Sequence, residues 1–269
     1  MSLFPQIASG AITSLPVSRS GRYVTRLNRL ADLNEYRYAD QANILMRWEV
    51  ALEAIPDADV TTLAAFFAAR NGKYSRFTFL DPLENLLKWS EDYSQSLWQK
   101  TGTFSLSAGQ ADPLGGTGAT LVTDTSGVTN NLWQTIAFGP ESQWFCSSVW
   151  LRAASPTTVE TLQCSDQGAQ VSDQSLAVGT TWKRFFTPAK FASSGSSVTQ
   201  WLLRFNAGQA LYVFGAQLAY LPGPGGYSKT TNSTGVHSVC RFDMDEFPHR
   251  ATDFGANSVG PLTVIEISG

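Results

Sequence analysis

The sequence has little of the chemistry that enzymes and metal sites use. Only two of its 269 residues are histidines, His237 and His249, and neither stands in a triad, a GxSxG motif or an HExxH motif. The three cysteines, Cys146, Cys164 and Cys240, are odd in number and lack CxxC spacing, so we expect buried reduced thiols and no disulfide framework or zinc site. Acidic residues are scattered among turns, without a pair of carboxylates placed for glycoside hydrolysis. We therefore expect a protein that is not an enzyme and that uses no cofactor and no metal.

Long hydrophobic runs and a strong net charge are also missing. No window of about 18 apolar residues occurs, which argues against a membrane span. The N-terminal stretch MSLFPQIASG has no basic segment followed by an apolar core, so a signal peptide is not expected. The net charge of -3 creates no field that would draw the chain onto nucleic acid or an anionic membrane. We expect neither membrane insertion nor a sequence-specific nucleic-acid partner.

The composition instead favours β structure with many turns. Hydrophobic residues make up 43% of the chain and charged residues 15%, with 22 glycines and 12 prolines. The length suits one large β domain or two ordinary domains, and two is the better starting expectation.

The first 89 residues contain one segment typical of a strand and one typical of a helix. Residues 1–45 have no clear period, and we expect strands and long loops there. Apolar and polar residues alternate over Leu45–Ile55, the pattern of a half-buried strand. A helix follows, capped by Asp57 or Asp59 and ending at Asn71-Gly72, with one core-facing stripe of Val60, Leu63, Ala64 and Phe67.

A strand is predicted next at Tyr74–Leu80, and Asp81-Pro82 ends it. From Asn85 to about Thr231 the composition changes. Residues 90–234 carry 7 Lys+Arg and 8 Asp+Glu, against 10 and 9 in the shorter span 1–89. Short alternating runs between turn clusters predict an antiparallel sandwich without a helix, with strands at Ala119–Val122, Asn131–Ala137, Trp144–Leu151, Thr181–Phe186, Gln200–Phe205 and Ala210–Ala219.

The last part of the chain has the same kind of sequence as the first part, with strand-like segments. The LPGPGG stretch at Leu221–Gly226 is typical of a linker that leaves the sandwich. Two further strands are predicted at Val239–Met244 and Leu262–Ile267, too few to form a domain alone. They should therefore pair with the first part of the chain, and one of them should be the partner of the strand at 77–80. The middle, residues 85–234, is then an insertion into a domain made of residues 1–84 and 235–269.

The outer parts of the sequence resemble the distal tail proteins of long-tailed bacteriophages and of related gene-transfer particles. The resemblance lies in the strand with Trp48, the helix with Phe66 and Phe67, Gly72, the run FTFLDP and the later segment SVCRFDMDEFPHR. It implies a β-sandwich or split-barrel domain with one α-helix. It also implies a ring, usually hexameric, at the end of the tail tube, where each subunit joins tail-tube protein to the tail-tip hub protein.

The middle resembles a carbohydrate-binding-module-like jelly roll found in many phage structural proteins. Its start, NLLKWSEDYSQSLWQK from Asn85, its inner segments SSVWLRA and TTWKRF, and its end, VFGAQLAYLPGPGGYSKTT from Val213, occur in order. Together the two resemblances imply a mainly β protein in which a discontinuous β-sandwich or split-barrel domain is interrupted by an inserted antiparallel β-sandwich.

Two tryptophans of the insertion are candidates for glycan binding, Trp133 and Trp182. Sugar rings present C–H faces that stack on indole, and these two tryptophans lie in polar surroundings beside Asn131 and Lys183. The alternative for any tryptophan here is a place in the core, which we expect for Trp144, Trp150 and Trp201 because they lie within strands.

Four early arginines, Arg19, Arg22, Arg26 and Arg29, have two interpretations of equal weight. In a ring they could line the lumen or pair with a neighbouring subunit. Alternatively they are ordinary solvated charges.

The sequence thus predicts a structural virion protein of the phage tail tip, made in the host cytoplasm. Its expected partners are other copies of itself in a ring (a homohexamer), tail-tube protein, the tail-tip hub and host-surface polysaccharide. The alternative is a glycan-binding adhesin or tail-fibre module in which the outer domain is only an anchor.

Overall fold

The chain folds into two compact units, which we describe from a computed structural model covering residues 2–31, 34–167, 170–192, 195–253 and 255–267. Unit 1 consists of residues 1–79 and 237–269, and unit 2 of residues 80–236. The sequence predicts boundaries after residues 84 and 234, and the two units meet after residues 79 and 236. The differences are five residues and two residues. The described elements are strands with one α-helix, which confirms the mainly β fold class.

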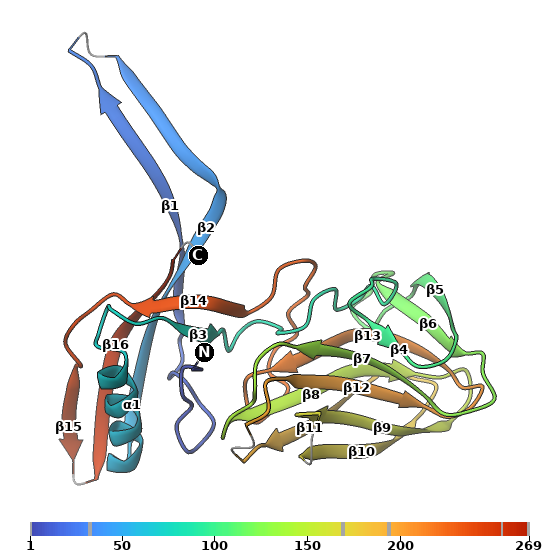
Figure 1. Ribbon diagram of the computed structural model, residues 1–269. Helices are drawn as coiled ribbons and strands as arrows, with labels where there is room; N and C mark the ends of the chain where they lie inside the picture. The colour runs from blue at the N-terminus through green and yellow to red at the C-terminus, as the bar shows by residue number, and fades with distance from the viewer. Residues whose placement is uncertain (1, 32–33, 168–169, 193–194, 254, 268–269) are drawn as a thin grey trace. The chain divides into compact units, whose positions relative to one another are not determined.

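Unit 1 is built on one sheet to which both ends of the chain contribute (Figure 1). β14 (Val236–Phe242) is the neighbour of β3 (Phe77–Leu80), which confirms the first of the two partners expected for this strand. β15 (His249–Asp253) pairs with β16 (Ala256–Glu266) and lies outside the main order of the sheet. The complete order across the sheet is β1 (Ser18–Arg29), β2 (Glu35–Ile55), β16 (Ala256–Glu266), β14 and β3.

The helix α1 (Asp57–Ala69) lies where the sequence predicts it, but its N-terminus differs. Pro56 is the N-cap residue, and no side chain caps the helix. Asp57 instead accepts a hydrogen bond of 2.8 Å from Asn257, and Asp59 accepts one of 2.9 Å from the backbone N–H of Ala8. The prediction of an aspartate cap is therefore wrong, because both carboxylates bind other segments. The predicted stripe is buried at Leu63 and Phe67 and half-buried at Val60 and Ala64.

The helix ends as predicted, since Asn71 and Gly72 both have positive φ, at 50° and 56°. The strand that follows is shorter than expected and begins at Phe77, and all four of its residues are buried rather than alternate ones. The reason is that the N-terminal segment runs along its free edge, with the N–H of Phe4 donating to the carbonyl of Thr78 at 2.9 Å. Phe4 then packs on the rings of Phe66, Phe77, Phe79 and Phe242.

Residues 18–55 form a long antiparallel hairpin, which we call the β1–β2 hairpin. Strands were expected here, but β2 begins ten residues before the predicted Leu45. The buried part of β2 includes Trp48, Val50 and Leu52, as its alternation predicts. Nearer the tip both faces of the hairpin are exposed, and this explains why no regular alternation of apolar and polar residues marks it.

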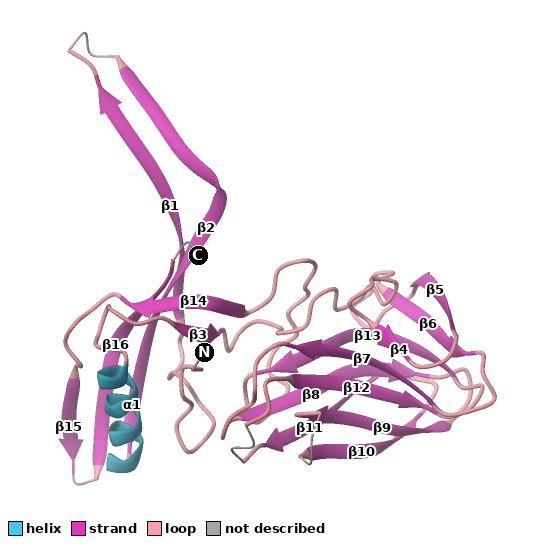
Figure 2. Cartoon of the chain, viewed as in Figure 1, coloured by secondary structure: helices cyan, strands magenta, loops and turns pink. Residues whose placement is uncertain are grey.

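Unit 2 is an antiparallel sandwich of two five-stranded sheets (Figure 2). We name each sheet after its central strand. The β12 sheet has the order β10 (Val171–Val178), β9 (Thr157–Ser165), β12 (Thr199–Phe205), β7 (Asn130–Ile136) and β4 (Gln99–Lys100). The β13 sheet has the order β11 (Lys183–Lys190), β8 (Trp144–Arg152), β13 (Ala210–Ala219), β6 (Ala119–Asp124) and β5 (Phe104–Gln110).

The core between the two sheets holds Trp201, whose indole N–H donates to the carbonyl of Ser148 at 3.3 Å. The expectation that Trp144 and Trp150 are also core residues is wrong. Their neighbours Phe145, Val149 and Leu151 occupy the core side of β8, so alternation turns both tryptophans to the outer side, where they are half-buried.

The two ends of unit 2 are tied to its last strand. Asn85, fully buried, donates to the carbonyl of Ala216 at 2.8 Å and accepts from the N–H groups of Leu87 and Leu218 at 3.0 Å each. The LPGPGG stretch is not a free linker, because Gln217 donates to the carbonyls of Pro224 and Gly226 at 2.9 Å. Its backbone is therefore fixed to the β13 sheet.

Candidate functional site

The outer face of the β12 sheet carries one tryptophan surrounded by amides. Trp133 lies in β7 between Leu132 and Gln134, which are both buried, so its half-buried indole points to the outer face. Within the described part of the chain, no hydrogen bond or ring contact of this indole is found. The register places it in one row that crosses all five strands, in the order Gln99, Trp133, Leu202, Gln163 and Asp173.

Polar side chains beside this row are held by hydrogen bonds to one another. Arg204 donates to Asn131 at 2.9 Å and also to Glu160 at 3.3 Å. On the other side of the row, Gln200 donates to the hydroxyl of Thr135 at 3.3 Å. These contacts fix the polar groups around Trp133 before any ligand arrives.

Such an arrangement suits a sugar chain. An indole face gives a stacking surface for pyranose C–H groups, and amides and hydroxyls at its sides can donate to and accept from sugar hydroxyls. The sequence identified Trp133 and Asn131. It missed Gln163 and Asp173, because the strands that carry them, β9 and β10, were not predicted.

Trp182 lies elsewhere on the sandwich. It comes directly before β11 in the β13 sheet and is half-buried beneath the guanidinium of Arg152, whose Cζ lies 5.4 Å from the ring centroid. Because Trp133 belongs to the β12 sheet, the fold does not bring the two predicted tryptophans together. Any ligand that uses both would have to be large enough to reach two different sheets.

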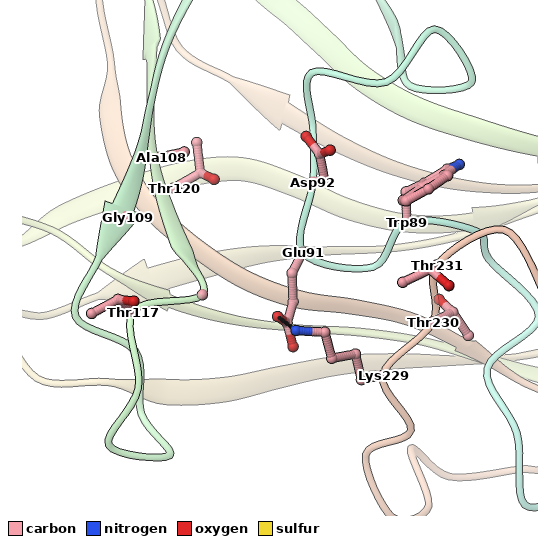
Figure 3. A pocket seen from close by; sticks show the side chains of 11 residues that line it. Trp89, Glu91, Asp92, Ala108, Gly109, Thr117, Thr120, Lys229, Thr230 and Thr231 are labelled. Carbon is pink, nitrogen blue, oxygen red and sulfur yellow. Dashed lines mark hydrogen bonds and ion pairs between the residues drawn. The ribbon is translucent and has the colours of Figure 1, made fainter.

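A pocket of about 300 Å³ opens in unit 2 near the start of the sandwich (Figure 3). Its central acid, Glu91, accepts hydrogen bonds from Tyr227 at 2.8 Å and from Lys229 at 2.5 Å. The pKa of Tyr227 is raised, chiefly by burial, which keeps its hydroxyl protonated as the donor. Asp92, also at the pocket, binds Ser94 and Gln95. Each of the two carboxylates already has donors within unit 2, so the pocket presents no free acid and base to a substrate.

The four arginines singled out in the sequence all lie on β1. Arg19, Arg22, Arg26 and Arg29 are exposed, and a register shift between Arg22 and Val24 separates the first two from the last two. Alternation turns Arg19 and Arg22 to opposite faces, and Arg26 and Arg29 likewise. Arg29 forms an ion pair of 3.2 Å with Glu35 across the hairpin. All four arginines therefore lie on one exposed strand of the hairpin.

The β1–β2 hairpin also exposes large apolar and aromatic side chains. Tyr23 is 71% exposed, Leu27 54%, Tyr36 67% and Tyr38 69%. The register pairs Asn28 with Tyr36 and Arg26 with Tyr38, so the last two tyrosines share one face. Exposed rings and leucines on a two-stranded ribbon are typical of a surface that another protein chain covers.

Reactive groups are few. All three cysteines are free and buried, as the sequence predicts, and burial raises the pKa of Cys146 and of Cys164 to about 12. His237 hydrogen-bonds Glu266 at 3.1 Å, and His249 hydrogen-bonds Asn257 at 2.9 Å. Across residues 2–267, apart from the gaps given above, no cluster of three His, Cys, Asp or Glu side chains could hold a metal ion.

No helix in the described part of the chain is long and apolar enough to cross a membrane.

Two arrangements stand out, the Trp133 face and the hairpin, and both are suited to binding.

No protein-family model matches the chain, and no curated protein matches its sequence. Among solved structures, the CBM22-1 xylan-binding domain of Xyn10C from Paenibacillus barcinonensis is 14% identical with a TM-score of 0.39, over 54% of this chain and 96% of that domain. TmCBM61, solved with β-1,4-galactotriose, is 14% identical with a TM-score of 0.38, over 50% of this chain and 97% of that one. The enzymatically active domain of tailspike protein 4 from bacteriophage CBA120 is 17% identical with a TM-score of 0.41, over 52% of this chain and 22% of that one.

These similarities describe a fold. The chain is similar to carbohydrate-binding modules and to a tailspike domain over about half of its length, and it spans about a fifth of that tailspike domain. Identities and TM-scores at this level carry no conclusion about a ligand, which must come from the residues themselves.

Proposed function

We propose that this chain is a structural protein of a phage tail tip, in which unit 1 assembles copies into a ring and unit 2 contacts host-surface polysaccharide. The chain acts by assembly and binding, without catalysis. In the ring, copies of unit 1 join tail-tube protein to the tail-tip hub protein, and the complete particle is assembled from chains made in the host cytoplasm.

The observation that carries this proposal is the exposed β1–β2 hairpin. Its apolar side chains are too exposed to contribute to the core of unit 1, and its first strand exposes Arg19, Arg22, Arg26 and Arg29. A ribbon with tyrosines and arginines on its surface has the composition of an interface, since both residue types are enriched at interface centres. We assign a second copy of the chain as the partner, because a repeated contact of this kind closes into a ring.

Replacing Tyr36 and Tyr38 together with serine is expected to convert the ring into monomers. Each tyrosine that is buried between copies stabilises the contact by about 2 kcal/mol, or roughly 30-fold in affinity. Mass photometry of the purified protein measures the change. Tyr74→Ser is the matched control, since Tyr74 is 83% exposed in unit 1 outside the hairpin and its loss should leave the ring intact. Wild-type protein that stays monomeric at micromolar concentration would contradict the proposal.

The Trp133 face supports the second half of the proposal, the contact with polysaccharide. Trp133→Ala is expected to weaken binding to a neutral polysaccharide by about 10-fold or more, because the stacking surface is removed. A glycan array identifies a ligand, and isothermal titration calorimetry measures the loss. Trp144→Ala is the control on the other sheet. Equal loss in both variants, or no binding by wild type to any host polysaccharide, would argue against a sugar site at Trp133.

A glycan-binding adhesin with unit 1 as an anchor is the second candidate. The Trp133 face favours it as much as the first, so the state of assembly decides between them. Binding through Trp133 by a protein that forms no ring, in solution or in particles seen by electron microscopy, would support the adhesin.

A further inference from the structure

The outer face of the β13 sheet carries a second arrangement, made of cations over aromatic rings. Arg184 lies over Trp150 with 4.3 Å between its Cζ and the ring centroid, and Lys190 Nζ lies 5.6 Å from the centroid of Trp144. Arg152, the last residue of β8, lies over two rings, at 3.9 Å from Tyr212 and 5.4 Å from Trp182. Cation–π contacts hold each of these head groups in place.

Arg152 differs from Arg184 in what its guanidinium binds. Arg184 donates to the carbonyls of Gly225 and Pro224 at 2.7 and 3.1 Å and to the hydroxyl of Ser148 at 3.0 Å. In the described part of the chain, Arg152 makes no hydrogen bond and no ion pair, and its Nε, like that of Arg184, is buried without a partner. Both Nη atoms of Arg184 therefore bind the fold, whereas the two Nη atoms of Arg152 remain available to a ligand.

The register explains how the site around Arg152 is built. Arg152 and Tyr212 are direct cross-strand partners on β8 and β13. On the other side of β8, Lys183 pairs with Leu151, which brings the preceding residue, Trp182, beside Arg152. The guanidinium is thus held between two half-buried rings from the neighbouring segments, and its geometry is fixed by strand pairing.

The charge around this site is positive, although the chain as a whole carries -3. Strands β8, β11 and β13 contain no aspartate or glutamate. The acid on the adjacent strand β6, Asp124, is 1% exposed and accepts a hydrogen bond from Asn130 at 3.1 Å. The four basic residues of β8 and β11 are Arg152, Lys183, Arg184 and Lys190. The carboxylate that reaches this face is Glu91, which binds Tyr227 beside Trp150 and forms an ion pair with Lys229. Because that pair offsets its charge, an anion near Arg152 still meets net attraction.

We propose that Arg152, Trp182 and Tyr212 form a binding site for a carboxylate-bearing sugar, such as a uronic acid residue of an acidic polysaccharide. The planar guanidinium pairs with a carboxylate through two parallel N–H donors, and the aromatic rings beside it stack on the sugar ring that carries the carboxylate. An isolated inorganic anion would leave the rings unused. A nucleic acid would need a row of available cations along its backbone, and Arg184 is already satisfied by carbonyls. This site is separate from the Trp133 face and stands without it.

Titration calorimetry with oligogalacturonate, and with the same oligomer after its carboxylates are reduced to alcohols, tests the site. Wild-type protein should bind the acidic oligomer at low salt, with an affinity that falls as salt is added, and should bind the reduced oligomer at least 10-fold more weakly. Arg152→Gln should weaken binding of the acidic oligomer by about 10- to 100-fold, because a charge-assisted pair is lost. Trp182→Ala should weaken it about 10-fold.

Three comparisons keep the result interpretable. Arg76→Gln makes the same substitution at an exposed residue of unit 1 and should leave the affinity for oligogalacturonate unchanged, as should Tyr74→Ser. Arg152→Lys retains the charge but not the two-pronged donor, and should fall between wild type and Arg152→Gln. Equal binding of the acidic and reduced oligomers, equal loss in Arg76→Gln, or tighter binding of a single-stranded oligothymidylate would each overturn the proposal.

Discussion

Replacing Asn85 with alanine is expected to lower the free energy of unfolding of unit 2 by about 3–5 kcal/mol, because a buried side chain that makes three hydrogen bonds is lost. The substitution leaves the N–H groups of Leu87 and Leu218 and the carbonyl of Ala216 without their partner. Asn85 is fully buried, so water does not replace these bonds without opening the structure. The effect should exceed that of any surface substitution in the sandwich.

Tryptophan fluorescence during urea unfolding measures this effect in unit 2 specifically. Of the 8 tryptophans, Trp48 alone belongs to unit 1. Asn232→Ala is the matched control, since Asn232 is exposed and only accepts a bond of 3.4 Å from Lys88. The control should change the unfolding midpoint little. Equal midpoints for Asn85→Ala and Asn232→Ala would show that the Asn85 bonds do not hold the first segment of the sandwich to β13.

Removing residues 82–234 and joining the ends with a Gly-Ser linker of about three residues is expected to leave unit 1 folded. The N–H of Asp81 donates to the carbonyl of Gly235 at 2.9 Å, so the segment that enters the sandwich and the segment that leaves it lie side by side. The linker therefore closes a gap that is already short, and its entropic cost is small. All six strands of the unit 1 sheet and the helix α1 are retained.

Trp48 becomes the one tryptophan of the shortened chain and reports whether it folds. In the folded unit it is fully buried and packs against Phe79, with ring centroids 4.7 Å apart. A folded product should show blue-shifted emission that moves to longer wavelength in one cooperative urea transition. Emission typical of exposed tryptophan before denaturant is added, or an insoluble product, would contradict the independence of unit 1. Full-length protein in the same buffer is the control.

Sequence patterns located most of the buried strands of both units, but they missed the interior strand β9 and failed at the exposed strands. Ala210–Ala219 was predicted with its observed ends, because its inner residues are apolar and turns bound it on both sides. β5 and β10 lie at sheet edges, and most of their residues are exposed or half-buried, so no apolar face marks them. The outer half of the hairpin at residues 18–55 was not located as strands either, because its exposed residues also form no apolar face.

The two proposed binding sites differ in how far the sequence alone points to them. Trp133 could be chosen because polar neighbours in an alternating strand turn one tryptophan outward. The sequence could not show that Arg152 lacks an ion-pair partner. That depends on which residues lie beside it, and the fold brings those residues together from three strands. Trp144 and Trp150 were assigned to the core because being in a strand says nothing about which of its two faces a residue takes.

The adjacency of Asp81 and Gly235 also bears on how proteins of this kind diversify. Recombination that replaces the coding segment between these two residues would bring in any domain whose own ends lie side by side, and the loop that unit 1 must close would not lengthen. A different second unit could then be acquired in one genetic event, without any compensating substitution in unit 1.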